Sequence, residues 1–398
     1  MKRNLLIAGI FALTLITCID PYVLKLNKYE SLLVVDGLIT DESVPYTIKL
    51  SKTYQDKDVL PVMVTNAEVN VKDKNGNTSA FMEVAQGIYR SDPDHFIGKA
   101  GETYTLHIKT NDGLEYESTP CLMTPVPEID SINFTPDKEF FDNGNTEETG
   151  IRIFINTGNE TENCKYFRWE FEEVWKFKTL YPAAYEYHGG SQVSSVPVEN
   201  QICWKYRQSK EIIIHSTESQ QTNRISRQPL KFIAPARSDR LLQQYSILVK
   251  QYSLSEAEFE FWNNFKQVSE SGGDIFEKQP FFIAGNIRCL NKGNEKILGY
   301  FQVSAVKQKR RYITKNDLRG IDLPYYRYPC NIVEVEFRST PSLSNDQIYS
   351  LYTGMGYVFA YPMYHGLALI GMAFSTRECS DCSLTGDSRK PDFWVDLP

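Results

Sequence analysis

Cysteines are the residues of this chain whose type and spacing most directly suggest chemistry. Cys379 and Cys382 form a Cys-x-x-Cys pair near the C-terminus. A zinc site would need further ligands, and the sequence has neither a second such pair nor closely spaced histidines. A thioredoxin-like redox site would need a βαβ context, which the sequence does not predict. We therefore predict disulfides that link the C-terminal segment to earlier strands, with Cys203 and Cys330 as the partner cysteines.

Cys18 suggests a covalent modification at the other end of the chain. A basic start, Lys2-Arg3, precedes an apolar stretch over residues 5–16, which is shorter than the roughly 20 residues that cross a bilayer. The stretch ends in Leu-Ile-Thr-Cys, which looks like a bacterial lipobox. We predict a lipoprotein signal peptide over residues 1–17, a lipid anchor on Cys18 that binds the bilayer, and a tether over residues 18–30. A plain secretory signal, or an anchor helix with a chance cysteine, is the alternative.

Export changes what the remaining cysteines can do. An exported chain meets an oxidising compartment, in which disulfides form and persist. Of the 8 cysteines, all but the anchored Cys18 remain available, which leaves an odd number. At least one thiol therefore stays outside any intramolecular disulfide.

The sequence offers no recognised catalytic motif. It contains no His-Glu-x-x-His, Gly-x-Ser-x-Gly, P-loop or complete Gly-x-Gly-x-x-Gly pattern. Its 5 histidines are dispersed, and no carboxylate pair can be chosen among 50 Asp and Glu residues without geometry. A formal net charge of −7 disfavours a nucleic-acid partner held through phosphate neutralisation. We therefore expect no metal, no cofactor and no catalytic residue.

Two aromatic clusters are the best candidates for a binding surface. The first alternates over residues 167–177, which predicts core, and ends in a tyrosine-rich segment that predicts an exposed loop. The second lies between Asp346 and Arg377, a stretch without formal charge. Glycines and a proline interrupt residues 349–364, so part of this segment should be loop. One interpretation is a buried pair of strands, and the other is a loop that grips a ligand or docks on a partner barrel. The candidate binding residues are Tyr181, Tyr185, Tyr187, Tyr352, Tyr357, Phe359, Tyr361 and Tyr364.

Strand signals dominate the elements that must position these side chains. Short runs of alternating apolar residues, such as residues 46–50, are separated by tight turns such as Asn75-Gly76. Over residues 31–122 this spacing predicts an immunoglobulin-like or transthyretin-like β-sandwich. Three prolines within residues 120–127 mark the boundary to a larger β-rich domain over residues 128–398. We expect an all-β, mainly antiparallel protein.

One helix is well signalled, near residues 255–271. Ser255 and Glu258 have the spacing of a capping box. Four apolar residues then recur at helical spacing, and a stripe of this type is usually core. They are Phe261, Trp262, Phe265 and Val268. The pattern predicts a helix packed on the second sheet.

Several short phrases, in order along the chain, resemble one bacterial family. Residues 33–42 (LVVDGLITDE) and 45–50 (PYTIKL) resemble its start, and residues 245–254 (YSILVKQYSL) resemble its central signature. The Gly285-Asn286-Ile287 phrase, residues 298–301 and the closing Cys379-x-x-Cys382 with its Lys390-Pro391 phrase fit as well. The chain is thereby similar to the Bacteroidetes family called domain of unknown function 4249.

This resemblance implies an outer-membrane lipoprotein, at the cell surface or the periplasmic face, of the kind often encoded beside TonB-dependent transporters. The family supplies no catalytic residues. We expect a non-catalytic protein that captures or gates a substrate for such a transporter, with a small ligand, a glycan or a peptide as cargo. A surface hydrolase acting on glycans or peptides, and a structural or assembly lipoprotein, are the alternatives.

Ser131 is a candidate for glycosylation. Asp130-Ser131-Ile132 resembles the Asp-Ser/Thr-apolar acceptor of Bacteroidetes O-glycosylation. The match falls at the start of the second predicted domain of an exported chain. A plain strand start is the alternative.

Overall fold

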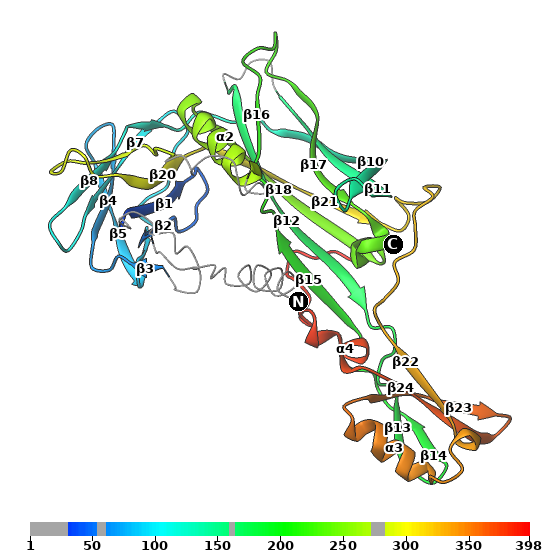
Figure 1. Cartoon of the computed structure of the whole chain (residues 1–398). Helices are drawn as coiled ribbons and strands as arrows, with labels where there is room; N and C mark the ends of the chain where they lie inside the picture. Colours follow the sequence, from blue (N-terminus) through cyan, green and yellow to red (C-terminus); the bar gives the residue numbers. More distant parts are fainter. Residues whose placement is uncertain (1–30, 54–60, 159–163, 272–282) are drawn as a thin grey trace, which may run out of the picture.

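The computed structural model describes residues 31–53, 61–158, 164–271 and 283–398. The predicted signal peptide, the lipidation site Cys18 and the tether over residues 18–30 lie outside the described residues. Within the described ranges, no helix is both long enough and apolar enough to cross a membrane. Figure 1 shows three parts: a curved first sheet, a central pair of sheets, and a small lobe that projects away from them.

The first part of the chain builds an 11-stranded sheet that nearly closes on itself. In β1 (Leu33–Ile39) and β7 (Thr103–Lys109) every second side chain is buried, as expected for strands with one face on a core. The other strands from this part are β2 (Thr47–Lys52), β3 (Val62–Met63), β4 (Glu68–Asp73), β5 (Thr78–Ala85), β6 (Ile88–Arg90), β8 (Glu115–Ser118) and β9 (Cys121–Leu122). The all-β, mainly antiparallel class is confirmed. The detail of an immunoglobulin-like or transthyretin-like sandwich is not, because one continuous sheet contains all of these strands.

Two strands from the second half of the chain complete this sheet. β19 (Ile287–Cys289) pairs with β8, and β20 (Ile297–Val303) pairs in parallel with β1. Asn286 links the two ends, because its side-chain amide donates to Phe301 O at 2.9 Å and its side-chain oxygen accepts from Phe301 N at 2.9 Å. The chain thus leaves the first sheet, builds the central sheets and returns. Residues 287–303, which the sequence placed in the second domain, belong to the first sheet.

Two antiparallel sheets form the centre of the molecule. The smaller has three strands, β10 (Ile129–Phe141), β11 (Thr146–Thr157) and β17 (Ile225–Ile233). The larger has five strands, β12 (Tyr166–Lys178), β15 (Ile202–Gln208), β16 (Ile213–Ser216), β18 (Gln244–Leu254) and β21 (Val306–Thr314). Two short 3-10 helices, η2 (Pro235–Arg237) and η3 (Asp239–Leu241), lead from β17 into β18.

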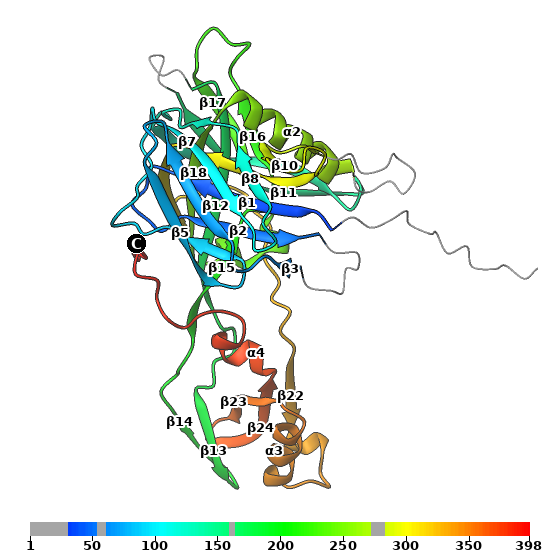
Figure 2. The same cartoon turned by 90° about the vertical axis from the view of Figure 1, so that its left-hand side faces the viewer.

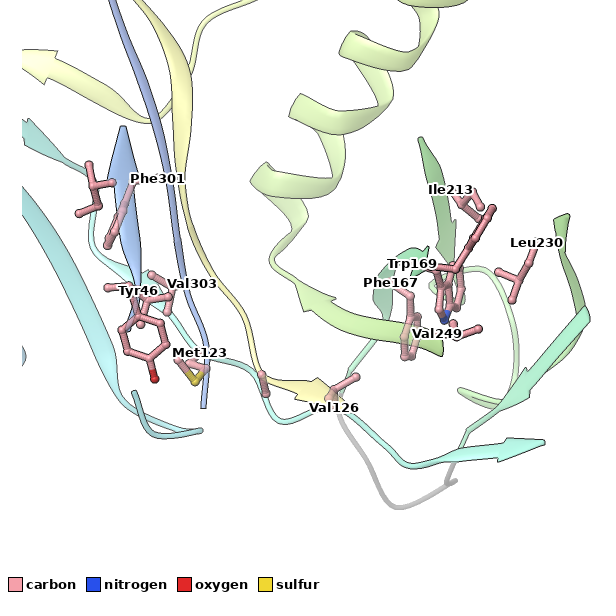
Figure 3. Packing of buried hydrophobic residues seen from close by; sticks show 14 of the residues in the cluster. Tyr46, Met123, Val126, Phe167, Trp169, Ile213, Leu230, Val249, Phe301 and Val303 are labelled. Carbon is pink, nitrogen blue, oxygen red and sulfur yellow. The ribbon is translucent and has the colours of Figure 1, made fainter. Parts of the chain in front are cut away.

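A single hydrophobic core runs through the first sheet and the central sheets. Figure 3 shows Met123 and Val126 between the buried side chains of the first sheet and those around Trp169. Both residues belong to the proline-rich segment that the sequence marks as a boundary. Hydrogen bonds fix the same segment, since Gln251 Nε2 donates to Pro127 O at 2.8 Å. The segment is therefore a buried crossing between sheets and not a free linker.

The predicted helix is α2 (Glu256–Ser271), and its capping box is confirmed. Glu258 N donates to Ser255 Oγ at 3.2 Å, and Ser255 N donates to Glu258 Oε2 at 3.0 Å. The helix contacts strands β12, β16 and β18 of the larger central sheet, as predicted. Figure 1 shows it on the side of this sheet that faces the first sheet.

The small lobe has its own sheet and its own core. The sheet has the order β22 (Ile332–Glu336), β24 (Ala368–Ser375), β23 (Val358–His365). The hairpin β13 (Tyr185–Gly189) with β14 (Gln192–Ser195), the 3-10 helix η4 (Phe337–Ser339) and the helix α3 (Asn345–Gly354) complete the lobe. Figure 2 shows that extended segments connect it to the centre. After β24 the chain returns through α4 (Arg377–Ser380) and η5 (Cys382–Leu384).

Candidate functional site

The four predicted cysteines form two disulfides where the lobe joins the centre. Cys203 of β15 is bonded to Cys382 of η5, and Cys330, which precedes β22, is bonded to Cys379 of α4. The prediction that the Cys-x-x-Cys pair links the C-terminal segment to Cys203 and Cys330 is confirmed. The sequence could not assign which cysteine pairs with which, because that depends on the fold of the intervening 179 and 49 residues. Among the described residues, no three His, Cys, Asp or Glu side chains gather into a metal-binding group.

The two predicted aromatic clusters meet in the lobe. Ring centroids lie 4.8 Å apart between Tyr187 and Tyr349, and 6.4 Å apart between Tyr181 and Tyr361. Phe359 is 4 % exposed, and the rings of Tyr352 and Tyr357 pack against the same small core. The tyrosine-rich end of the first cluster and the second cluster therefore form the interior of the lobe, whereas residues 167–177 of the first cluster contribute to the core of the central sheets, as predicted. Among the candidate binding residues, Tyr185 and Tyr364 are the ones with large exposed surface.

The loop expected within residues 349–364 is short: α3 ends at Gly354, residues 355–357 form the connection, and β23 begins at Val358. Ser344 caps α3 in a capping box with Gln347, a signal that the sequence contained and that our reading missed. Gly354 ends this helix. Pro362 is tolerated in β23 because β23 is an edge strand, whose outer backbone groups need no partner.

Two tyrosines of these clusters have internal partners. Tyr187 donates to Asp346 at 2.6 Å, and Tyr361 donates to Glu334 at 2.5 Å. Since burial and the Glu334 carboxylate raise the pKa of Tyr361 to about 12, its phenol stays neutral at physiological pH. These hydrogen bonds hold the hairpin β13–β14 and strand β23 in place, which is a structural role.

Ser131 lies on β10, an ordered strand. Its hydroxyl accepts from the amide of Asn133 at 2.9 Å and from the amide of Asn156 at 3.0 Å. Glycosylation of Ser131 stays a prediction, and these contacts place its hydroxyl beside polar side chains of β10 and β11.

The aromatic stripe of α2 lines a groove instead of filling a core. Phe265 is 43 % exposed, and Phe261, Trp262 and Val268 are half-buried. The groove has a volume of about 670 Å³, which falls within the range of small-molecule sites. The sequence periodicity correctly predicted which face of the helix is apolar. The surface opposite this face does not pack closely against it, so a groove remains between them. The prediction of a buried core stripe is therefore wrong for this helix.

The opposite wall of the groove comes from the first sheet. Strand β1 contributes Val34, Asp36 and Leu38, which alternate with its buried core residues, and strand β20 contributes Leu298 and Tyr300. The rings of Phe261 and Tyr300 lie 4.8 Å apart and connect the helix to that wall. Because β1 and β20 are far apart in sequence, their parallel pairing creates this wall.

One end of the groove carries an ion pair. Arg168 is 7 % exposed, and its Nη1 donates to Glu170 Oε1 at 2.5 Å. The guanidinium also lies over the ring of Trp262, 4.4 Å from its centroid, and over the ring of Tyr252 at 4.9 Å. Arg168 Nε and Trp262 Nε1 are buried donors that have no hydrogen-bond partner within the described part of the chain.

A second hollow of about 600 Å³ lies on the other side of the same aromatic residues. It shares Arg168, Glu170, Trp262 and Phe265 with the groove, and strand β16 supplies Ile213 and Ile214. The aromatic stripe thus separates two hollows that meet at one ion pair. Sequence analysis missed Arg168 and Glu170, because charged residues alternate with aromatic residues along much of β12 and nothing in that pattern singles out these two.

A buried carboxyl lies at the foot of α2. Glu258 is 2 % exposed, and burial raises its pKa to about 7, although hydrogen bonds from Ser255 and the charge of Arg168 act in the opposite direction. Burial, together with the nearby Glu258, also raises the pKa of Tyr300. The Glu258 carboxyl, at the N-terminus of the helix, therefore acts electrostatically on Tyr300 in the wall formed by β20.

The groove combines an apolar lining with a few charged side chains. Its aromatic and aliphatic lining would desolvate an apolar body, and the ion pair would orient a polar end. The Glu170 carboxylate is already held by Arg168 and by the hydroxyl of Tyr252, 3.2 Å away.

No curated protein matches this chain. The sequence profile of the family described as "Domain of unknown function (DUF4249)" matches residues 19–310, most of the chain, and the protein therefore belongs to that family.

Proposed function

We propose that this protein is a lipid-anchored outer-membrane binding protein that captures a ligand in the groove along α2 for a TonB-dependent transporter. The observation that carries the binding part is the exposed aromatic stripe facing β1 and β20 across about 670 Å³. The Cys18 motif supports the anchor, and the family resemblance supports the transporter. The ligand is an amphipathic small molecule whose apolar or aromatic part contacts Phe261 and Phe265.

The chemistry of the groove favours capture with later release. Apolar contact supplies affinity in proportion to the area removed from water, and aromatic side chains supply much of that area. The ion pair of Arg168 with Glu170 is internally neutral, and Asp36 is the other charged residue that lines the groove. A ligand held mainly by apolar contact can leave without breaking strong charge pairs, as delivery to a transporter requires.

Binding in the groove can be tested with 1-anilinonaphthalene-8-sulfonate, a fluorescent aromatic probe. Phe265→Ala should weaken binding of the probe about tenfold, because one well-packed aromatic contact is worth on the order of 1–2 kcal/mol. The thermal midpoint should change little, since Phe265 is 43 % exposed. Phe140→Ala is the matched control, because Phe140 is 64 % exposed on β10. Equal probe affinity in the wild type and both variants would contradict the binding proposal.

The anchor and the partner need a separate experiment in native membranes. Cys18→Ala should release the protein from the membrane fraction or leave an uncleaved precursor. A detergent pull-down with the wild-type protein should recover an outer-membrane transporter. If the wild-type N-terminal peptide carries no acyl mass, the anchor proposal is wrong; if no transporter copurifies, the delivery proposal loses its support.

A further inference from the structure

A third hollow lies where the chain passes from the larger central sheet into the lobe. It has a volume of about 670 Å³ and is separate from the groove along α2. Three segments far apart in sequence form it: the end of β12, residues 235–243 around η2 and η3, and residues 315–328. We call it the neck pocket. Its residues belong to neither aromatic cluster that the sequence singled out.

The charge of the neck pocket differs from that of the whole chain. The chain carries 50 acidic and 43 basic residues, yet no Asp or Glu lines this pocket. Lys178 and Lys315 line it and are exposed, and neither has an ion-pair partner within the described ranges. By contrast, Lys176, two residues before Lys178, is paired with Asp396 at 2.8 Å.

Asp239, whose charge acts on two tyrosines of the pocket, does not neutralise these lysines. Its Oδ1 accepts from Trp175 Nε1 at 2.9 Å, and its Oδ2 accepts from Lys205 at 2.7 Å. Asp239 is therefore occupied by Trp175 and Lys205, and the two lysines of the pocket keep their charge available for a ligand.

Tyrosines supply the other half of the pocket. Tyr325 is 87 % exposed, an unusual state for so large an apolar surface. Tyr326 and Tyr328 pack edge to face with their centroids 5.2 Å apart. Burial raises the pKa of Tyr328 to about 12, so its phenol remains a neutral donor at physiological pH. None of these phenols makes a hydrogen bond within the described part of the chain.

One buried hydroxyl in the wall of the pocket lacks a hydrogen-bond partner among the described residues. Thr179 lines the neck pocket and is 6 % exposed, and its Oγ1 has no hydrogen-bond partner among the described residues. Buried polar groups without partners are uncommon in folded proteins and call for an explanation. The Oγ1 atom is inaccessible to solvent, so it marks an unsatisfied polar group in the wall of the pocket and is not itself a ligand contact.

We infer that the neck pocket binds a ring-shaped ligand that carries a carboxylate, such as a sugar acid. Lys178 and Lys315 attract the carboxylate, since the ammonium group is a compact donor for anions. Tyr325 and its neighbours contact the face of the ring, because tyrosine offers a rigid apolar surface with a polar tip. The volume exceeds that of one ring, so a short acidic glycan fits the same chemistry.

Titration of the purified protein with glucuronate, followed by calorimetry or ligand-observed NMR, tests this inference. Glucose serves as the uncharged ring, and benzoate as a carboxylate on an aromatic ring. Glucuronate should bind, and glucose should bind at least tenfold more weakly. If benzoate binds as tightly as glucuronate, the site accepts aromatic acids. If benzoate binds more weakly than glucuronate, the site is specific for sugar acids. Raising the salt concentration should weaken binding, because the charges are exposed.

Variants separate the neck pocket from the other sites. Lys178→Gln combined with Lys315→Gln should weaken glucuronate binding at least tenfold, and Tyr325→Ala should do the same without altering the thermal midpoint. Lys49→Gln is the matched control, because Lys49 is an exposed lysine of β2 in the first sheet. Phe265→Ala should leave glucuronate binding unchanged, so the result does not depend on the proposed groove. Absence of binding by both acids, equal binding of glucose, or an unaffected double variant would overturn the inference.

Discussion

The body of the molecule, made of the first sheet and the central sheets, differs from the lobe in what holds it together. The body contains one continuous core that extends from Leu33 to Cys382 and includes Trp169, Phe301 and many aliphatic residues. The core of the lobe has only six fully buried members, among them Phe359 and Phe374. Both disulfides lie at or beside the junction of the two regions.

The difference follows from the ratio of surface to volume. A small unit buries a smaller fraction of its surface, so its hydrophobic stabilisation offsets less of the conformational entropy lost on folding. Cross-links reduce the entropy of the unfolded chain and compensate for this deficit. The Cys203–Cys382 disulfide joins two residues of the body core, whereas Cys330–Cys379 closes the segment that contains the sheet of the lobe. The lobe should therefore depend most on the Cys330–Cys379 cross-link.

The largest expected effect is that of removing the Cys203–Cys382 disulfide. Its loop spans 179 residues, and the chain-entropy model assigns such a cross-link about 5 kcal/mol. Cys203→Ser with Cys382→Ser should therefore sharply increase hydrogen exchange in β15 and the C-terminal segment, while β1 and β7 stay protected and the lobe keeps its own Cys330–Cys379 cross-link. Cys121→Ser is the control, since Cys121 forms no disulfide. Simultaneous loss of protection in body and lobe would mean that the two regions fold as one unit.

Truncation of a core aromatic residue in each region should have the next largest effect. Phe374→Ala should destabilise the lobe by about 4 kcal/mol, because a fully buried phenylalanine leaves a cavity. Phe301→Ala should destabilise the first sheet by a similar amount. Hydrogen exchange should locate each loss in its own region. If Phe374→Ala instead increases hydrogen exchange in the first sheet, the body and the lobe do not unfold independently.

Glu258 should give the body a pH dependence that the lobe lacks. Its pKa is about 7 in the folded protein against 4.5 for an ordinary carboxyl, so from about pH 4.5 to 7 the folded state holds a proton that the unfolded state has lost. Stability should therefore fall as pH rises through this window, by on the order of 3 kcal/mol, and stay lower above it.

Urea unfolding at pH 5 and pH 8 checks this expectation. Glu258→Gln keeps an oxygen that can accept from Ser255 N, so the helix cap is retained while the titration is removed. The wild type should lose more stability between the two pH values than the variant, by about 2–3 kcal/mol. An identical loss in both proteins would show that Glu258 does not titrate in this range.

The smallest effect is expected at the surface of the lobe. Tyr364 is 50 % exposed, so Tyr364→Ala should change stability by no more than about 0.5 kcal/mol. Tyr357→Ala should cost more, because Tyr357 packs against the core of the lobe, with its ring 6.0 Å from that of Tyr352. Thermal unfolding of both variants measures the difference. Equal midpoints would return Tyr357 to the set of candidate contact residues.

Local patterns determined much of this protein without any structure. Alternation identified the strands around residues 46–50 and 104–108, and the Ser255–Glu258 spacing located the helix α2. The predicted export signal and the lack of further zinc ligands indicated cross-links for the Cys-x-x-Cys pair. These signals act between residues that are neighbours in sequence, so the chain itself contains them.

Only the tertiary structure decided which surfaces meet. Leu33 pairs in parallel with Ile297 in the first sheet, and Tyr187 packs on Tyr349 in the lobe. Both contacts join segments that lie far apart in the sequence. The same periodicity that marks the apolar face of α2 cannot state whether a close-packed layer or an open groove lies opposite. That outcome depends on where β1 and β20 are held, and their position results from hydrogen bonding and burial summed over the whole fold. The proposed binding sites are therefore properties of the packing, whereas many of the strands, helix α2 and the disulfide cysteines could be recognised in the sequence.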